Sequence, residues 1–276
     1  MFISTLYKPY LVQIGFYFLL ILALSHCQKR VEGCTQPIAS NYNPEADTDC
    51  CCLFYNLQLN VQHLAADSIS FFSLNQPFSL NSGDIITPLG FSMLISNIQL
   101  INTRNQPFAI NDSLNFVLNN GSSEPFADDF TLFEPNAFLY NIGKFTSLDT
   151  FARLVFTVGL DTRRVGINPT NIADVANPLS LLAVPMLYDN SNNRYNTAVF
   201  RFALNSPVDT ISLAFATNIR IELPCPIAVI DGRNTKINLN VYYATLFDNI
   251  NFRTQTIDTI QTRFKQNLTR SFEVQR

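Results

Sequence analysis

The sequence is poor in charged residues, contains no tryptophan and has only two histidines, His26 and His63. Charged residues make up 14% of the chain and the formal net charge is -3, so no basic patch indicates a nucleic-acid partner. A Ser-His-Asp or Cys-His catalytic arrangement would have to use His63. No Gly-x-Ser-x-Gly nucleophile motif accompanies it, and no glycine-rich phosphate loop is present. We therefore expect a protein that is not an enzyme.

One carboxylate cluster offers an alternative to that expectation. Paired-carboxylate hydrolysis would be possible in principle through Asp128, Asp129 or Glu134. Neighbouring aspartates are more typical of a solvated turn, and this interpretation is favoured.

The N-terminus has the features of a signal peptide, predicted for residues 1–26. Lys8 precedes an apolar run from Leu11 to Leu24, which is short for a membrane span and suits a signal-peptide core. The mature chain should have no transmembrane segment. The protein is expected to be exported, to the periplasm, to the outer membrane as a lipoprotein, or to the cell surface.

Two cleavage sites are compatible with this leader. Leu24 to Cys27 has the position of a lipobox, which would leave a lipid anchor on Cys27. Alternatively, Ala23 and Ser25 fit the small-x-small pattern of an ordinary signal peptidase, which would make His26 the first mature residue. Both alternatives remain open.

The cysteines predict disulfides, because an exported chain meets an oxidising compartment. Residues 27–54 lack an apolar period, so this segment, the cysteine module, should be held together by disulfides. Its acidic residues could also offer oxygens to calcium. Neighbouring cysteines are poorly placed to pair with each other, so the run at 50–52 should find outside partners. The candidates are Cys27, Cys34, Cys50, Cys51, Cys52 and Cys225.

From residue 55 onward the sequence predicts an all-β domain, an antiparallel two-sheet sandwich with long loops that extends to residue 276. Leu57, Leu59, Val61 and His63 share one face of a strand whose other face is polar. The segment 91–101 is apolar on both faces and changes phase near Ser96-Asn97, which indicates a central strand with a bulge. Further alternating strands are predicted at 154–160, 197–204, 211–215, 219–223 and 237–243.

Two segments outside the regular pattern lead to specific expectations. The strand at 154–160 leads into a polar loop, in which Asp161 is expected to cap the turn and Arg163 to pair with it on the surface. Near the C-terminus, Ile257, Ile260, Phe264 and Leu268 recur at three- and four-residue intervals. This spacing predicts one amphipathic helix of about three turns that packs on the sandwich, with a membrane-surface helix as the less favoured alternative.

Several stretches, in order, resemble the MbnP-like domain, a methanobactin-associated, copper-binding family of exported bacterial proteins. The resemblance covers roughly residues 55–275 and depends on order and spacing rather than on one motif. The segment 33–44 also resembles a cysteine-rich unit of secreted Bacteroidota proteins. The stretches that resemble the MbnP-like domain are LQLNVQHLA (57–65), FSMLISNIQL (91–100), FTVGLD (156–161), MLY (186–188) with the strand 197–204, and INLNVYYATLF (237–247).

The resemblance implies copper, held in the family by two histidines and an oxidised tryptophan made with a di-haem partner enzyme. His63 matches the first-strand histidine of that pattern. Because this chain has no tryptophan, the oxidised ligand cannot form and the di-haem partner is not expected. The remaining route to copper would combine the amine and ring of His26 with His63. The resemblance therefore implies a degenerate copper site.

A second hypothesis needs no metal. The domain would be a cell-surface interaction or carbohydrate-binding β-sandwich, contacting its partner through aromatic side chains of the loop from Met186 to Asn196.

Overall fold

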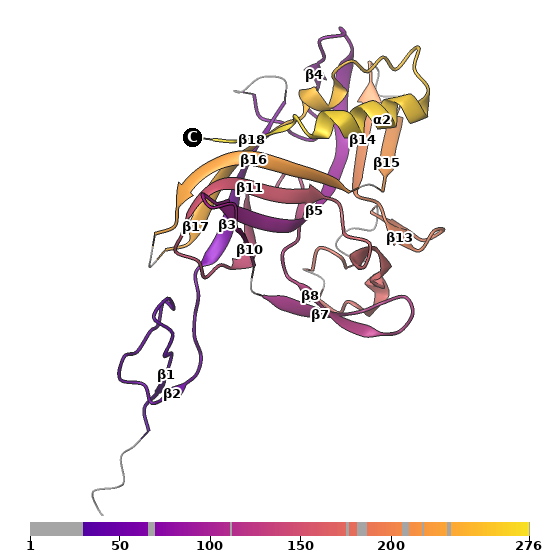
Figure 1. Ribbon diagram of the computed structural model, residues 1–276. Helices are drawn as coiled ribbons and strands as arrows, with labels where there is room; N and C mark the ends of the chain where they lie inside the picture. The colour runs from indigo at the N-terminus through magenta and orange to yellow at the C-terminus, as the bar shows by residue number, and fades with distance from the viewer. Residues whose placement is uncertain are drawn as a thin grey trace, which may run out of the picture. The chain divides into compact units, whose positions relative to one another are not determined.

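The computed structural model describes residues 30–65, 70–110, 112–174, 177–180, 187–205, 210–216, 218–230 and 233–275. The chain divides into two compact units, Met1–Leu53 and Phe54–Arg276, one residue from the predicted boundary (Figure 1). The predicted signal peptide, with His26 and Cys27, lies outside the described residues. Within the described residues, no helix is both long and apolar enough to cross a membrane.

The cysteine module contains a short parallel ribbon of β1 (Glu32–Gly33) and β2 (Thr48–Asp49). A disulfide joins Cys34 to Cys52, so this part of the module is stapled by a disulfide as expected. The chain neighbours Cys50 and Cys51 are bonded to each other, which differs from the expectation of outside partners. Cys51 has a positive φ of 54°, and this turn of the backbone accompanies the pairing.

Cys225 also differs from the expectation, since it is a free thiol rather than half of a disulfide. It lies on a strand of the second unit with its side chain in the hydrophobic core. Burial raises the pKa of this thiol to about 11. The inward position explains its lack of a disulfide partner, and a buried thiol with a raised pKa is expected to react slowly.

The second unit is the predicted all-β sandwich. A four-stranded sheet has the order β10-β3-β17-β18, with β3 at Asn56–Leu64, β10 at Leu139–Lys144, β17 at Thr235–Tyr242 and β18 at Phe272–Val274. An eight-stranded sheet has the path β15-β14-β5-β11-β16, with β4, β6 and β9 also paired to β5. Its strands are β4 (Phe78–Ser79), β5 (Ile85–Asn102), β6 (Pro107–Ala109), β9 (Thr131–Phe133), β11 (Thr150–Val158), β14 (Ala198–Leu204), β15 (Thr210–Phe215) and β16 (Ile219–Ala228).

One pairing in the four-stranded sheet differs from the purely antiparallel prediction. Strands β3 and β17 run parallel, with Leu59 opposite Ile237 and His63 opposite Val241. Parallel neighbours need a long connection, and here all strands of the eight-stranded sheet lie between them in the sequence.

Two hydrophobic clusters occupy opposite faces of the eight-stranded sheet. The larger cluster fills the space between the two sheets and includes Leu59, Phe156 and Phe200. The smaller cluster includes Leu94 and Phe126 and is covered by the hairpin of β7 (Ser113–Val117) and β8 (Ser123–Ala127), by the ribbon of β12 (Tyr188–Asp189) and β13 (Arg194–Tyr195), and by the 3-10 helices η1 (Arg164–Gly166) and η2 (Pro169–Asn171). This double burial explains why β5 is apolar on both faces.

The predicted phase change in β5 is confirmed. Asn97 has a positive φ of 53°, and the register between β5 and β11 shifts between Val155 and Thr157. The extra residue is a bulge, which lets the strand keep apolar side chains on both faces as it continues toward Ile101.

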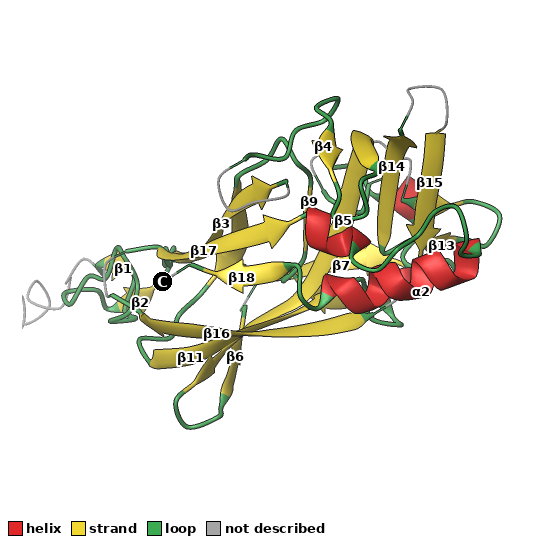
Figure 2. Cartoon of the chain, turned by 90° about the horizontal axis from the view of Figure 1, so that it is seen from above, coloured by secondary structure: helices red, strands yellow, loops and turns green. Residues whose placement is uncertain are grey.

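The C-terminal helix is confirmed as α2 (Ile257–Leu268), with Thr256 as its N-cap (Figure 2). Ile260, Phe264 and Leu268 are buried, and the Phe264 ring centroid lies 5.4 Å from that of Phe215 in β15. The helix therefore packs on the sandwich, as favoured from the sequence. Ile257 differs from the predicted stripe, because it is 51% exposed at the first turn.

Candidate functional site

His63 lies near the end of β3 with its side chain in the core and none of its surface exposed. Its Nδ1 atom is 2.8 Å from the Tyr243 hydroxyl, and its Nε2 atom is 2.9 Å from the Ala137 carbonyl oxygen. A carbonyl oxygen can only accept, so Nε2 carries the proton. Nδ1 then accepts a hydrogen bond from the Tyr243 hydroxyl. Both ring nitrogens are therefore engaged in hydrogen bonds.

Aromatic rings enclose this histidine. Tyr243 stacks on Phe72 with centroids 3.6 Å apart, and Phe91 meets the same tyrosine ring edge-on at 4.9 Å. The Phe138 ring lies 6.0 Å from the imidazole. Burial lowers the pKa of His63, which keeps the ring neutral.

A copper ion needs a lone pair from an imidazole nitrogen. Here one nitrogen carries the proton bonded to Ala137, and the lone pair of the other accepts from Tyr243. Freeing Nδ1 for a metal would leave the buried Tyr243 hydroxyl without this hydrogen bond, at a cost of roughly 1–3 kcal/mol, whereas the Ala137 carbonyl also accepts from the Tyr140 hydroxyl at 2.9 Å. The described residues around His63 do not fit a copper ion in this arrangement.

The described residues bring together one other group of metal-ligating types, in the cysteine module. Atoms of Cys34, Asp49 and Cys52 lie within 4.8 Å of one another. The two sulfurs are bonded to each other, so neither is a thiolate ligand. The Asp49 carboxylate accepts a hydrogen bond from the Thr35 backbone N–H at 2.9 Å, which lowers its pKa. This group is thus explained by the local structure of the module.

The loop proposed to contact a partner holds two buried tyrosines. Tyr188 and Tyr195 are 9% and 3% exposed, and their ring centroids are 5.1 Å apart. The Tyr195 hydroxyl donates a hydrogen bond to the Leu179 carbonyl at 2.6 Å. Met186 lies outside the described residues. The two rings anchor the loop in the smaller hydrophobic cluster, which contradicts their prediction as contact residues.

The polar loop after β11 behaves partly as expected. The Asp161 carboxylate accepts hydrogen bonds from the backbone N–H groups of Arg163 and Arg164, both at 2.9 Å, which confirms its capping role. Arg163 pairs with Glu124 on the neighbouring hairpin rather than with Asp161, which corrects the predicted pair. The register of the hairpin, which the loop sequence alone does not specify, determines this partner.

Arg164 and Asp129 form a buried ion pair that the sequence did not reveal. They are 3% and 4% exposed, and the Arg164 Nη2 atom lies 2.7 Å from an Asp129 carboxylate oxygen. The same nitrogen donates to the Ala127 carbonyl at 2.9 Å. Burial raises the pKa of Asp129 and of its neighbour Asp128. The solvated turn expected at these aspartates is therefore wrong for Asp129, which the hairpin and η1 bury together with its arginine.

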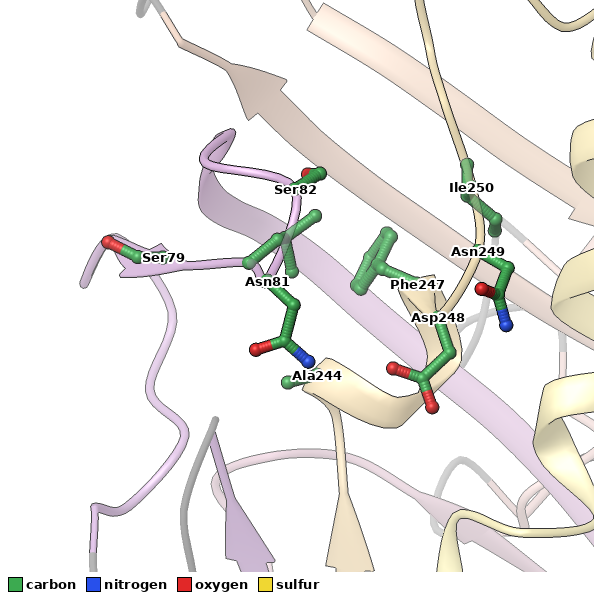
Figure 3. Close-up of a pocket in the computed structure, with 9 residues that line it drawn as sticks. Ser79, Asn81, Ser82, Ala244, Phe247, Asp248, Asn249 and Ile250 are labelled. Atoms are coloured by element: carbon green, nitrogen blue, oxygen red, sulfur yellow. The ribbon is translucent and has the colours of Figure 1, made fainter.

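A polar cavity of about 380 Å³ lies between the turn that leads into β5 and the 3-10 helix η3 (Ala244–Phe247), as Figure 3 shows. Ser79, Asn81 and Asn249 contribute hydroxyl and amide groups to its wall. The Asp248 carboxylate lies 3.8 Å from the Arg270 guanidinium, so its charge is partly compensated. The arrangement offers hydrogen bonds to a small polar molecule rather than a nucleophile with its base.

Comparisons with known proteins add little. No family model matches the chain, and no curated protein matches it. Among solved structures, the chain is similar to "MbnP from Methylosinus trichosporium", with 11% sequence identity and a TM-score of 0.43 over 71% of this chain and 78% of that one. Both values are low, so the similarity extends to the fold at most.

Proposed function

We propose that this chain is an exported, non-enzymatic β-sandwich protein that acts as a cell-surface interaction module, and that His63 is a structural residue rather than a copper ligand. The observation that supports the structural role of His63 most directly is the engagement of both imidazole nitrogens of this fully buried residue. The copper site implied by the sequence resemblance is degenerate on this proposal, since it also lacks the tryptophan of the family.

His63 has a structural role that accounts for its presence at this position. Through Tyr243 it ties β3 to the segment after β17, and through Ala137 it ties β3 to the segment before β10. A neutral imidazole suits this position because it can accept from a hydroxyl and donate to a carbonyl at the same time. Few other side chains satisfy both partners with one planar ring.

The Cys34–Cys52 disulfide supports export, because such bonds form in oxidising compartments. The destination within periplasm, outer membrane or cell surface depends on the processing of residues 24–27, which lie outside the described residues. Intact mass of the protein from membranes of the native host would decide between a lipid on Cys27 and a start at His26. We expect Cys225 to react with a thiol reagent only after denaturation in either case.

Copper titration of the mature protein tests the proposal. Wild type, His63→Gln and His26→Ala would be compared by equilibrium dialysis against Cu(II) and, under reducing conditions that leave the disulfides intact, against Cu(I). Glutamine keeps a donor and an acceptor at the position of His63. We expect wild type and His63→Gln to bind the same amount of copper. Loss of bound copper in folded His63→Gln would overturn the structural role of His63.

A further inference from the structure

The outer face of the four-stranded sheet is covered by side-chain amides. Gln58, Asn60 and Gln62 alternate with the buried residues of β3, and Asn238 and Asn240 do the same on β17. Register places Asn60 opposite Asn238 and Gln62 opposite Asn240. In Figure 2, β3, β17 and β18 lie side by side, which makes this face one continuous surface, here called the amide face.

Hydrogen bonds between neighbouring strands fix these amides in place. Asn60 donates to the Asn238 side-chain oxygen at 2.9 Å. Gln275, just after β18, donates to the side-chain oxygens of Gln62 at 2.8 Å and Asn240 at 2.7 Å. Asn60, Gln62 and Asn238 each use one end of their amide in these bonds, whereas the buried Asn240 is engaged at both ends, because it also donates to the Tyr242 hydroxyl at 3.0 Å. The amide face therefore presents donors and acceptors whose rotamers are already ordered.

One acceptor at this face lacks a partner. The Gln58 side chain is 8% exposed and donates to Asn141 on β10, but its Oε1 atom accepts no hydrogen bond from the described residues. A buried amide oxygen without a donor is unfavourable by roughly 1–3 kcal/mol unless a ligand or water supplies one. Because this oxygen is itself buried, a bound molecule can reach only the more exposed amides of Asn60, Gln62 and Asn238.

The shape and charge of the face narrow the class of ligand. A hollow of about 480 Å³ lies at its β18 edge, lined by Asn240, Glu273, Val274 and Gln275. The half-buried Tyr242 next to it donates its hydroxyl to Glu273 at 2.6 Å, so its ring is fixed. Strands β3, β17 and β18 contribute one exposed cation, Lys236, and one exposed anion, Glu273, and the exposed Lys144 of β10 is paired with Asp112 at 3.1 Å. These charges offset each other, so the amide face is nearly neutral.

We propose that the amide face binds a neutral glycan chain, an inference that rests on the proposed role as an interaction module and names its ligand class. Glycan hydroxyls both donate and accept, as amides do, and they can serve ordered amides without bringing a charge. A protein partner of stable affinity would be expected to meet an apolar centre in its interface, whereas the large exposed apolar side chain of this face, Leu139, lies on the edge strand β10 opposite Asn60. Nucleic acid would require a cluster of cations.

Affinity electrophoresis in native gels tests this proposal. The gels would contain one neutral polysaccharide each, namely laminarin, a soluble cellulose derivative without charge, xyloglucan, galactomannan or dextran, with hyaluronan as the acidic comparison. We expect at least one neutral polysaccharide to retard the wild-type chain. The variants Asn60→Ala on β3 and Asn238→Ala on β17, both at more exposed positions of the amide face, should each weaken that retardation roughly tenfold.

Asn115→Ala provides the matched control, since Asn115 is an exposed strand asparagine on β7, away from the amide face. It should leave retardation unchanged. Failure of every neutral polysaccharide to retard the wild type would overturn the proposal, and so would retardation that Asn60→Ala and Asn238→Ala do not change. Retardation by hyaluronan alone would also contradict it.

Sedimentation of the same variants separates a glycan from a second copy of the chain. If wild type is a dimer that Asn238→Ala dissociates, the amide face is a self-association surface and the glycan proposal is wrong. An unchanged sedimentation coefficient, together with weakened retardation, supports it. If no neutral polysaccharide retards the protein and copper binding does not depend on His63, only the inference of a glycan ligand is refuted. Copper binding that depends on His63 would refute the proposed function itself.

Discussion

The two faces of strand β3 differ in how fully the hydrogen-bonding groups of their polar side chains are engaged by the described residues. His63 points inward, where both of its nitrogens are engaged by Tyr243 and Ala137. Asn60 and Gln62, on the opposite face, each have one amide end bonded to a neighbour and the other end directed outward. Histidine, the residue type usually linked to metal binding, is thus engaged at both ring nitrogens. The amides of Asn60 and Gln62 are each engaged at one end.

This contrast shows that whether a side chain can bind a ligand depends on its hydrogen-bond partners in the fold, and not on residue type alone. Tyr243 is 180 residues from His63 in the sequence, and Ala137 is 74 residues away. Sequence patterns place His63 on the buried face of a strand, but only the folded chain reveals which groups meet its nitrogens.

The largest expected effect on stability comes from the buried ion pair of Arg164 with Asp129, which is compared with the exposed pair of its neighbour Arg163. Arg164→Ala removes one partner of the buried pair with Asp129 and should lower the free energy of unfolding by about 3–5 kcal/mol. Arg163→Ala removes an exposed pair with Glu124 and should cost about 0–1 kcal/mol. Urea unfolding followed by circular dichroism measures both. Similar losses of unfolding free energy for the two variants would contradict the distinction between buried, fully partnered polar groups and exposed ones.

The same comparison within β3 should give a somewhat smaller difference. His63→Ala removes the acceptor of the buried Tyr243 hydroxyl and one of the two donors to the Ala137 carbonyl, and it opens a cavity, so we expect a loss of about 3 kcal/mol. Gln62→Ala, on the amide face, should change stability by less than about 0.5 kcal/mol. Equal denaturant midpoints for these variants would show that His63 is not held as described.

The pH dependence of stability gives a smaller and more specific effect. The folded chain holds the pKa of His63 below its usual value, because burial disfavours the charged ring. When the pH falls below about 6.5, the unfolded chain takes up a proton that the folded chain does not. Stability should therefore decline, by up to about 1.4 kcal/mol per pH unit, until the pKa of the folded state is reached.

His63→Gln isolates this contribution from the aspartates that also titrate. Burial raises the pKa of Asp128 and Asp129, so their contribution to the pH dependence of stability has the opposite sign. The difference in unfolding free energy between wild type and His63→Gln should shrink as the pH is lowered from 7 to 5. A difference that stays constant over this interval would contradict a depressed pKa for His63.

Much of the fold could be predicted from local patterns. The period of two in β3, β14 and β17, the phase change at Asn97 and the helical spacing of Ile260, Phe264 and Leu268 are all read from neighbouring residues, and the structure confirms them. Asp161 as a turn cap is equally local, since the groups it binds are two and three residues away.

The features that escaped prediction depend on contacts between distant segments. The parallel pairing of β3 with β17 joins residues about 180 apart, and the burial of Asp129 requires Arg164 to arrive from another loop. The amide face is of the same kind. Alternation shows that Gln58, Asn60 and Gln62 share a face, but it gives no indication that Asn238 and Asn240 lie beside them.

The central claim is that hydrogen bonds engage both ring nitrogens of His63 and leave neither for a metal. It is tested most directly by ¹⁵N NMR of the imidazole. With only two histidines in the sequence, the ring signals are easily assigned by comparison with His63→Gln. We predict a neutral ring protonated at Nε2 near pH 7, with signals that neither shift nor broaden when one equivalent of Cu(II) is added. Loss or broadening of the His63 ring signals at that ratio would contradict the account.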